Sequence, residues 1–176
     1  GVESCQFILA HDFIPKDLES AYQSLTDNLI QQIGWCYERA GSVDLIRTHG
    51  DCHIGNILWT DDGPHLVDLD DSRMTPAIQD LWMFLSGDRT DQETILARLL
   101  EGYTRFYEFD ARQLHLVEAL RTLRLIHHYA WLARRWTDPA FPRAFPWFNS
   151  QRCWEQHILD LREQAALMSD PPLNIS

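Results

Sequence analysis

The side chains best suited to chemistry lie together in residues 47–85, where carboxylates, an amide and imidazoles alternate with short apolar runs. Polar groups on loops between buried strands usually serve binding or catalysis. A hairpin centred on Asp62 would place Asn56 opposite Asp68, with facing Cβ atoms about 4.5–5.5 Å apart. Asp51 can reach the same place from the preceding loop. We therefore expect one amide oxygen and two carboxylates to share a site.

The donor atoms of this predicted site indicate its ligand. Hard oxygen donors with few nitrogens or sulfurs favour Mg²⁺, which keeps several waters and usually completes its shell with substrate phosphates. A carboxylate that the metal does not need can orient or deprotonate a hydroxyl nucleophile. Phosphoryl transfer uses both kinds of group, metal ligands and a carboxylate for the hydroxyl, because it depends on positioning more than on covalent chemistry.

The same stretch resembles the kinase-like phosphotransferase superfamily of aminoglycoside and choline kinases. The segments HGDCHIGNILW, VDLDD and QDLWM are most similar to a bacterial branch of that superfamily, whose members are serine/threonine protein kinases of the stress response. The resemblance is specific over residues 47–85 and weaker along the flanks. It rests on His49-Gly50-Asp51 followed by Asn56, on Val67-Asp68 and on Asp80-Leu81-Trp82.

This resemblance implies roles for the predicted site. Asp51 would be the catalytic-loop base, Asn56 and Asp68 would be Mg²⁺ ligands, and ATP would be the phosphoryl donor. Asp68 would also take the position of the aspartate in the kinase Asp-Phe-Gly motif. Two departures are present: no Phe-Gly follows Asp68, and only twelve positions separate it from Asp80, too few for a long activation loop.

Four other polar residues of this stretch have expected roles, and for two of them the role is left open. His49 is expected to hold the loop backbone by hydrogen bonds, and Asp80 to accept backbone N–H groups of the same loop. Asp70 and Asp71 either bind a second Mg²⁺ or an acceptor, or they are exposed carboxylates that cap the following segment.

Zinc is a further alternative, because His49, Asp51 and His53 alternate as ligands on one strand face would. Gly50 and Gly55 break up such a strand, however, and no further His or Cys follows at ligand spacing. His53 is instead expected to shape the loop or to line the nucleotide cleft.

Composition limits the class of protein. With 176 residues, 45% hydrophobic content and seven Trp, the chain can bury a sizeable core. A net charge of -11 disfavours a nucleic-acid binder. Four cysteines without a C-x-x-C pair predict reduced thiols of a cytoplasmic protein, and no apolar run approaches about 18 residues. We expect a cytoplasmic monomer without nucleic-acid or membrane partners.

Helical periodicity dominates the remaining sequence, so the predicted class is α+β, mainly α with a small β-hairpin. Phe7–Ala10 fits a strand or a connecting segment, and three prolines in residues 138–146 predict an irregular loop. The predicted helices run from Pro15 to Gly41, Pro76 to Gly87, Asp91 to Tyr107, about Ala111 to Trp136 and Ser150 to Met168.

A mainly helical domain with a small β-hairpin resembles the C-terminal lobe of a protein-kinase-like fold. A Gly-rich phosphate loop is absent from the sequence, and Lys16, the only lysine, lies at a helix start. We therefore expect residues 1–14 to be a linker from an N-terminal lobe outside this sequence, 15–170 the helical C-terminal lobe and 171–176 a tail. Alone, such a chain would be nearly inactive, because electrostatic positioning of the phosphates is incomplete.

Three functions remain open at this stage. The first, implied by the resemblance, is an ATP- and Mg²⁺-dependent kinase for protein Ser/Thr hydroxyls in a stress response. The second is a small-molecule kinase of the aminoglycoside, choline or homoserine type, and the third is a catalytically silent binding module. Basic side chains of the predicted helix from Ala111 to Trp136 form either its solvated face or part of an acceptor site. These are Arg121, Arg124, His127, His128, Arg134 and Arg135.

Overall fold

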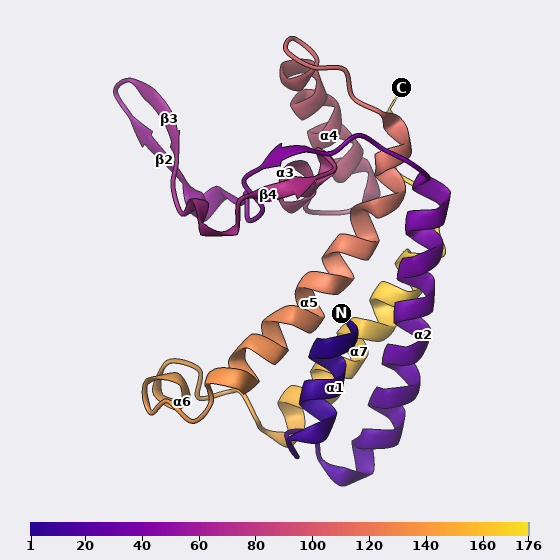
Figure 1. Ribbon diagram of the computed structural model, residues 1–176, viewed down its shortest axis with the longest axis vertical. Helices are drawn as coiled ribbons and strands as arrows, with labels where there is room; N and C mark the ends of the chain where they lie inside the picture. The colour runs from indigo at the N-terminus through magenta and orange to yellow at the C-terminus, as the bar shows by residue number, and fades with distance from the viewer. Residues whose placement is uncertain (176) are drawn as a thin grey trace. The chain divides into compact units, whose positions relative to one another are not determined.

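The fold, obtained as a computed structural model, is mainly helical with two small antiparallel sheets (Figure 1), and the structure describes residues 1–175. Its contacts divide into two compact units. The hairpin unit comprises residues 36–120 and the chain from Pro171 onward. The helical unit comprises residues 1–35 and 121–170. The predicted α+β class with a small β-hairpin is confirmed.

The hairpin unit has two pairs of strands and several short helices. In Figure 1 the β2–β3 hairpin extends away from the β1–β4 pair. The elements in chain order are β1 Ile46–Thr48, the 3-10 helix η1 Ile54–Asn56, β2 Ile57–Thr60, β3 Gly63–Leu66, η2 Leu69–Asp71, β4 Arg73–Thr75, α3 Ile78–Leu81, η3 Trp82–Phe84, α4 Arg89–Tyr103 and η4 Ala111–Leu116.

The core of the hairpin unit lies among its helices. A capping box at Asp88 and Asp91 starts α4, because each side chain accepts the backbone N–H of the other residue. Apolar side chains of α4 and of the neighbouring helices are buried together in one cluster. They include Ala40, Ile78, Trp82, Leu85, Leu96, Leu100, Leu114, Leu116 and Val117.

The helical unit is built from long amphipathic helices. Ser150 starts the last of them by accepting the N–H of Cys153 at 3.1 Å. The boundary between the units falls within two helices, so each unit contains only part of them. The helices are α1 Val2–Ala10, α2 Lys16–Ala40, α5 Val117–Arg135, α6 Ala140–Ala144 and α7 Gln151–Leu167. None of the helices in residues 1–175 is both long and apolar enough to cross a bilayer.

Several predicted bounds differ from the observed ones. Phe7–Ala10 belongs to α1, because Ser4, Cys5 and Ile8 are buried at helical spacing. The helix predicted to reach Tyr107 ends at Tyr103, where α4 gives way to turns.

The proline-rich loop differs from its prediction, and the tail makes hydrogen bonds that the sequence does not indicate. Within the loop α6 forms a short helix, because Pro139 precedes its first turn, where a missing N–H costs nothing. The tail hydrogen-bonds to α4: the Arg89 guanidinium donates to the carbonyl oxygens of Pro171 and Pro172 at 3.0 and 2.6 Å. The Asn174 N–H donates to Glu93 at 2.9 Å, whereas Ser176 lies outside the described residues.

Candidate functional site

The loop after β1 is anchored by a carboxylate from α3. Asp80 accepts the backbone N–H of His49 at 2.7 Å through Oδ2 and that of Gly50 at 2.9 Å through Oδ1. These are the hydrogen bonds predicted for Asp80. Both oxygens of one carboxylate are used, so the backbone that leads into Asp51 has a fixed direction.

His49 connects the same loop to the end of β3. Its ring is buried, and Nε2 donates to the carbonyl oxygen of Val67 at 2.8 Å. Nδ1 accepts the N–H of Asp51 at 3.3 Å, which requires the tautomer protonated only at Nε2. Both ring nitrogens therefore serve backbone groups, as predicted for a structural histidine.

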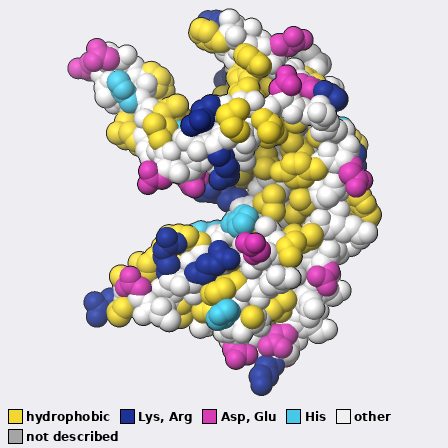
Figure 2. All heavy atoms as spheres, in the orientation of Figure 1, with side chains coloured by type: hydrophobic (Ala, Val, Ile, Leu, Met, Phe, Trp, Pro, Cys, Tyr) yellow, Lys and Arg dark blue, Asp and Glu magenta, His cyan; other side chains and the backbone are white. Residues whose placement is uncertain are grey.

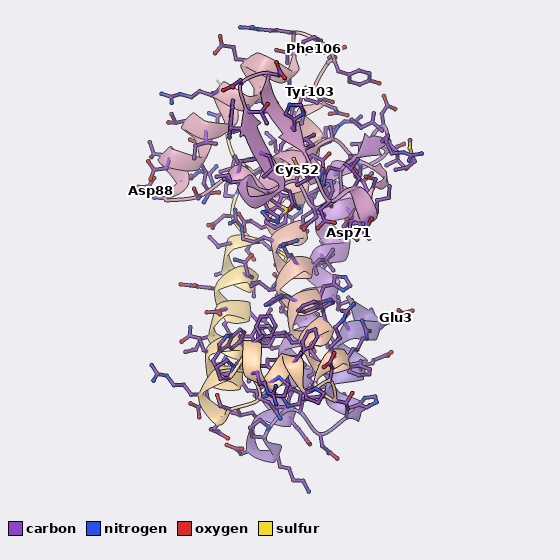
Figure 3. All side chains as sticks on the ribbon, turned by 90° about the vertical axis from the view of Figure 1, so that its left-hand side faces the viewer. Glu3, Cys52, Asp71, Asp88, Tyr103 and Phe106 are labelled. Carbon is purple, nitrogen blue, oxygen red and sulfur yellow. The ribbon has the colours of Figure 1, made fainter. Side chains whose placement is uncertain are left out.

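Gly50 allows the loop to approach η2 closely. Its φ of 88° is left-handed, and a Cβ at this position would collide with the carbonyl of Asp71. The Gly50 carbonyl accepts from the Gln79 side chain at 3.1 Å. Figure 3 labels Cys52 and Asp71, which mark the two segments that meet here.

Asn56 is buried and hydrogen-bonded to the loop that holds Asp51. Its Nδ2 donates to the backbone carbonyl of Asp51 at 3.0 Å, so Oδ1 is the amide atom left for a cation. Across the hairpin, the Asn56 carbonyl accepts the N–H of Val67 at 3.0 Å. Asn56 thus contacts the loop on one side and the returning chain on the other.

The hairpin register differs by one residue from the predicted one. Thr60 pairs with Gly63 around a two-residue turn, so Asn56 lies opposite Val67 and not opposite Asp68. The prediction centred the turn on one residue, which shifts every pair along the hairpin. Asp68 follows one position later.

Asp68 has a left-handed backbone, with φ 62° and ψ 64°. This conformation costs about 1 kcal/mol or more for a residue other than glycine, although Asp tolerates it better than most. Strain of this kind is concentrated at functional sites. The Asp68 side chain is exposed and makes no hydrogen bond or ion pair within residues 1–175. Its carboxylate is therefore open to a ligand.

The donor set suits Mg²⁺ and not zinc. Among residues 1–175 no group of three or more His, Cys, Asp or Glu side chains converges on a metal position. His49 is occupied on both nitrogens and so has none left for zinc, and His53 Nδ1 accepts the N–H of Gly55 at 3.0 Å. The oxygen donors Asn56 and Asp68 fit Mg²⁺, which takes few protein ligands and completes its shell with water and phosphate.

His53 contacts the predicted base. Its Nε2 lies 3.5 Å from Oδ2 of Asp51, while Nδ1 is held by Gly55. The neighbouring Cys52 is buried, and burial, together with the negative charges of Asp80 and Asp51, raises its thiol pKa to about 11. Cys52 is therefore a buried, protonated thiol and not a reactive one.

Sequence reasoning missed two contacts and left two carboxylates undecided. Gln79 and Ser72 both donate to the loop backbone, Ser72 to the His49 carbonyl at 3.4 Å. Neither has a sequence signal, because a single polar residue beside an apolar run usually faces solvent. Asp70 and Asp71 are exposed in η2, so their predicted roles stay predictions.

Comparison with known proteins shows the family of this chain. A family model described as the phosphotransferase enzyme family matches residues 15–117, which include the whole loop and hairpin. The chain is 46% identical to stress response kinase A of Escherichia coli O157:H7 and 45% identical to that of strain K12. It is 44% identical to the serine/threonine protein kinase RdoA of Salmonella typhimurium strain LT2.

Each of these alignments covers 163 residues, which is 93% of this chain and 49% of the relative. The chain thus spans about half the length of the curated relatives it matches. The family match contains Asp51, Asn56 and Asp68 together with the carboxylate that anchors their loop. On these grounds the chain belongs to the phosphotransferase enzyme family.

Proposed function

We propose that this chain carries the catalytic loop of an ATP- and Mg²⁺-dependent kinase. The observation that supports the proposal best is the way two segments are held together. The Asp80 carboxylate holds the loop of Asp51 against α3, and the His49 ring binds that loop to Val67, the residue before Asp68. These contacts bring a proton acceptor, Asp51, and two oxygen ligands, Asn56 and Asp68, to the open end of the hairpin. Phosphoryl transfer requires both a group that acts on the acceptor hydroxyl and ligands for the metal.

Asp51 would act on the acceptor. Its carboxylate orients the acceptor hydroxyl and takes its proton as the oxygen forms a bond to the γ-phosphorus of ATP. The bond from that phosphorus to the bridging oxygen breaks, and ADP leaves. Bound Mg²⁺ would supply neutralisation of phosphate charge. Asn56 would hold it through Oδ1 and Asp68 through its carboxylate.

We propose a protein Ser/Thr hydroxyl as the acceptor and a stress-response role in the cytoplasm. Support comes from the relatives, which are named stress response kinase A and serine/threonine protein kinase RdoA. The four cysteines are free and buried, in agreement with a reducing compartment.

Residues 1–176 alone are expected to turn over very slowly. The chain spans about half of its relatives' length, and its sequence has no Gly-rich loop or strand lysine to cradle phosphates. The exposed Leu58, Trp59 and Leu66 of the hairpin support the proposal that other parts of a longer protein cover it. Kinase turnover by this chain equal to that of a full-length relative would contradict this.

The test uses a version of the protein that matches its relatives in length. With radiolabelled ATP, label should appear on protein and not on choline, homoserine or an aminoglycoside. Asp51→Asn should abolish transfer while Mg²⁺-dependent protection by ATP in a thermal shift persists. Asp68→Asn should abolish both. Unchanged phosphorylation by Asp51→Asn would refute the assignment of the base, and label on a small amine would refute the acceptor.

A further inference from the structure

Arginine is concentrated in one part of an acidic chain. The chain has a net charge of -11, yet residues 121–150 hold five arginines and a single carboxylate, Asp138. All of these residues belong to the helical unit. Residues 121–150 therefore have a net positive charge, whereas the whole chain has a net negative charge.

The end of α5 arranges this charge around an aromatic ring. His128, Trp131 and Arg135 share one helix face, because they are three and four residues apart. The Arg135 guanidinium carbon lies 4.7 Å from the Trp131 ring centroid. The His128 ring also stacks with Trp131, at a centroid distance of 6.1 Å and an angle of 15°. Trp131 itself is 38% exposed.

α6 extends this surface with further aromatic rings. Phe141 meets Trp131 edge-on at 5.2 Å, and Phe145 does so at 6.1 Å. Trp147, 47% exposed, follows Phe145 at 6.2 Å. Arg143 is exposed on the same short helix. We call Trp131, Arg134, Arg135 and Arg143 the basic-aromatic face.

The arginines of this face are not neutralised. None of Arg134, Arg135 and Arg143 forms an ion pair within the described part of the chain. Arg134 lies over the Phe7 ring of α1 at 5.0 Å. Asp138, the nearest carboxylate in sequence, accepts the N–H of Ala140 at 2.9 Å. The guanidinium N–H groups are therefore free to bind an anion.

Rigid arginines beside exposed aromatic rings are typical of protein interfaces. Arg and Trp are enriched at interface hot spots. Stacking on a ring fixes the plane of a guanidinium while its N–H fork remains available for a carboxylate. In Figure 2, arginine and hydrophobic side chains lie next to one another over the region of α5 and α6.

We propose that the basic-aromatic face binds an acidic segment of a partner polypeptide. Asp or Glu carboxylates would pair with Arg135 and Arg143, and an apolar side chain would pack on Trp131. The size of the partner decides its class, because a nucleic acid or an anionic membrane would also meet the acidic remainder of a chain whose net charge is -11. A short acidic peptide meets only the local positive field. This binding is independent of phosphoryl transfer.

The test measures fluorescence polarisation with the intact 176-residue chain. The probe is a fluorescein-labelled peptide of Glu, Asp and Leu, and its counterpart carries Lys at every acidic position. The acidic probe should bind at least about tenfold more tightly, a difference of about 1.4 kcal/mol. Its affinity should fall as salt increases. Equal affinity for the two peptides, or no binding of the acidic one, overturns the proposal.

Variants locate the binding on the face. Arg135→Ala with Arg143→Ala should weaken binding about tenfold, and so should Trp131→Ala, while circular dichroism shows the helices intact. Arg162→Ala removes an exposed arginine of α7 and should leave affinity unchanged. Because both arginines are exposed, the double variant does not depend on Trp131→Ala folding. Loss in Arg162→Ala equal to that in the double variant, or tighter binding of single-stranded DNA or anionic vesicles than of the acidic peptide, overturns the proposal.

Discussion

Asp80 and His49 are thirty-one positions apart in the chain, yet Oδ2 of Asp80 accepts the His49 backbone N–H at 2.7 Å. The other oxygen binds the next N–H along the loop. A side chain of α3 therefore sets the geometry of a loop that it does not belong to, and the candidate site depends on that contact as much as on its own residues.

Removing this anchor should destabilise the fold. Asp80→Ala leaves two buried N–H groups without an acceptor, so we expect a loss of about 2–3 kcal/mol in the free energy of unfolding by urea. Asp80→Asn keeps one acceptor oxygen and should lose less. Asp61→Ala, at the exposed hairpin turn, should change stability by less than about 0.5 kcal/mol. Equal losses in Asp80→Ala and Asp61→Ala would show that the anchor contributes nothing.

A side chain at Gly50 should be tolerated worse than one at another left-handed glycine. Gly50→Ala combines backbone strain with a collision against the Asp71 carbonyl. Gly63 has φ 112° and nothing within 4 Å of an added Cβ, so Gly63→Ala carries the strain alone. We expect Gly50→Ala to cost about 2 kcal/mol more than Gly63→Ala. If denaturant midpoints of the two variants coincide, the close approach to Asp71 is not rigid.

The left-handed backbone of Asp68 should lower the stability of the fold. Asp68→Gly removes the cost of the left-handed backbone, so we expect the free energy of unfolding to rise by about 1 kcal/mol. Asp68→Ala removes the same carboxylate but keeps the strain and should be the less stable of the two. Both should lose Mg²⁺-dependent nucleotide protection in a protein of the relatives' length. A more stable Ala variant than Gly variant would argue against strain at this residue.

Stability of the helical unit should fall in mild acid because of His157. The His157 ring is fully buried and stacks on Tyr129 at 3.6 Å. Burial, with a smaller contribution from His128, lowers the pKa of His157 to about 3. In the unfolded chain the ring binds a proton near pH 6.5, so protons favour unfolding.

This contribution is fully present above about pH 6.5 and is lost as the pH falls towards about 3. Between pH 7 and 5 we expect a loss of about 2 kcal/mol in the free energy of unfolding. His157→Phe should remove most of this slope, whereas His65→Gln, at an exposed position, should retain it. The measurement is urea unfolding at each pH. A slope unchanged in His157→Phe would contradict the assignment.

Local sequence rules predicted most of the helices and the hydrogen-bonding roles of His49 and Asp80. Periodicity located α2 and α7 closely, because Pro15, Gly41 and Ser150 mark their ends with backbone chemistry. The same rules failed where tertiary contacts decide. The hairpin register depends on a two-residue turn that the sequence TDDG does not distinguish from a longer one.

Other hydrogen bonds between residues far apart in the chain were not predicted from the sequence. The role of Asp80 was predicted, but nothing in the sequence indicates that Gln79 beside it donates to Gly50, or that Arg89 binds the tail. Each of these side chains could equally face water, and only the path of a distant backbone determines which one occurs.

The short turn of the β2–β3 hairpin has a practical consequence. Asn56 and Asp68 lie at its base, where the Val67 N–H and the His49 ring hold the two sides together. Asp61 and Asp62 lie at its exposed tip. Lengthening the tip would leave the spacing at the base unchanged. In residues 1–176 alone, the tip is therefore a permissive place for an inserted epitope or fluorophore that reports from beside the site.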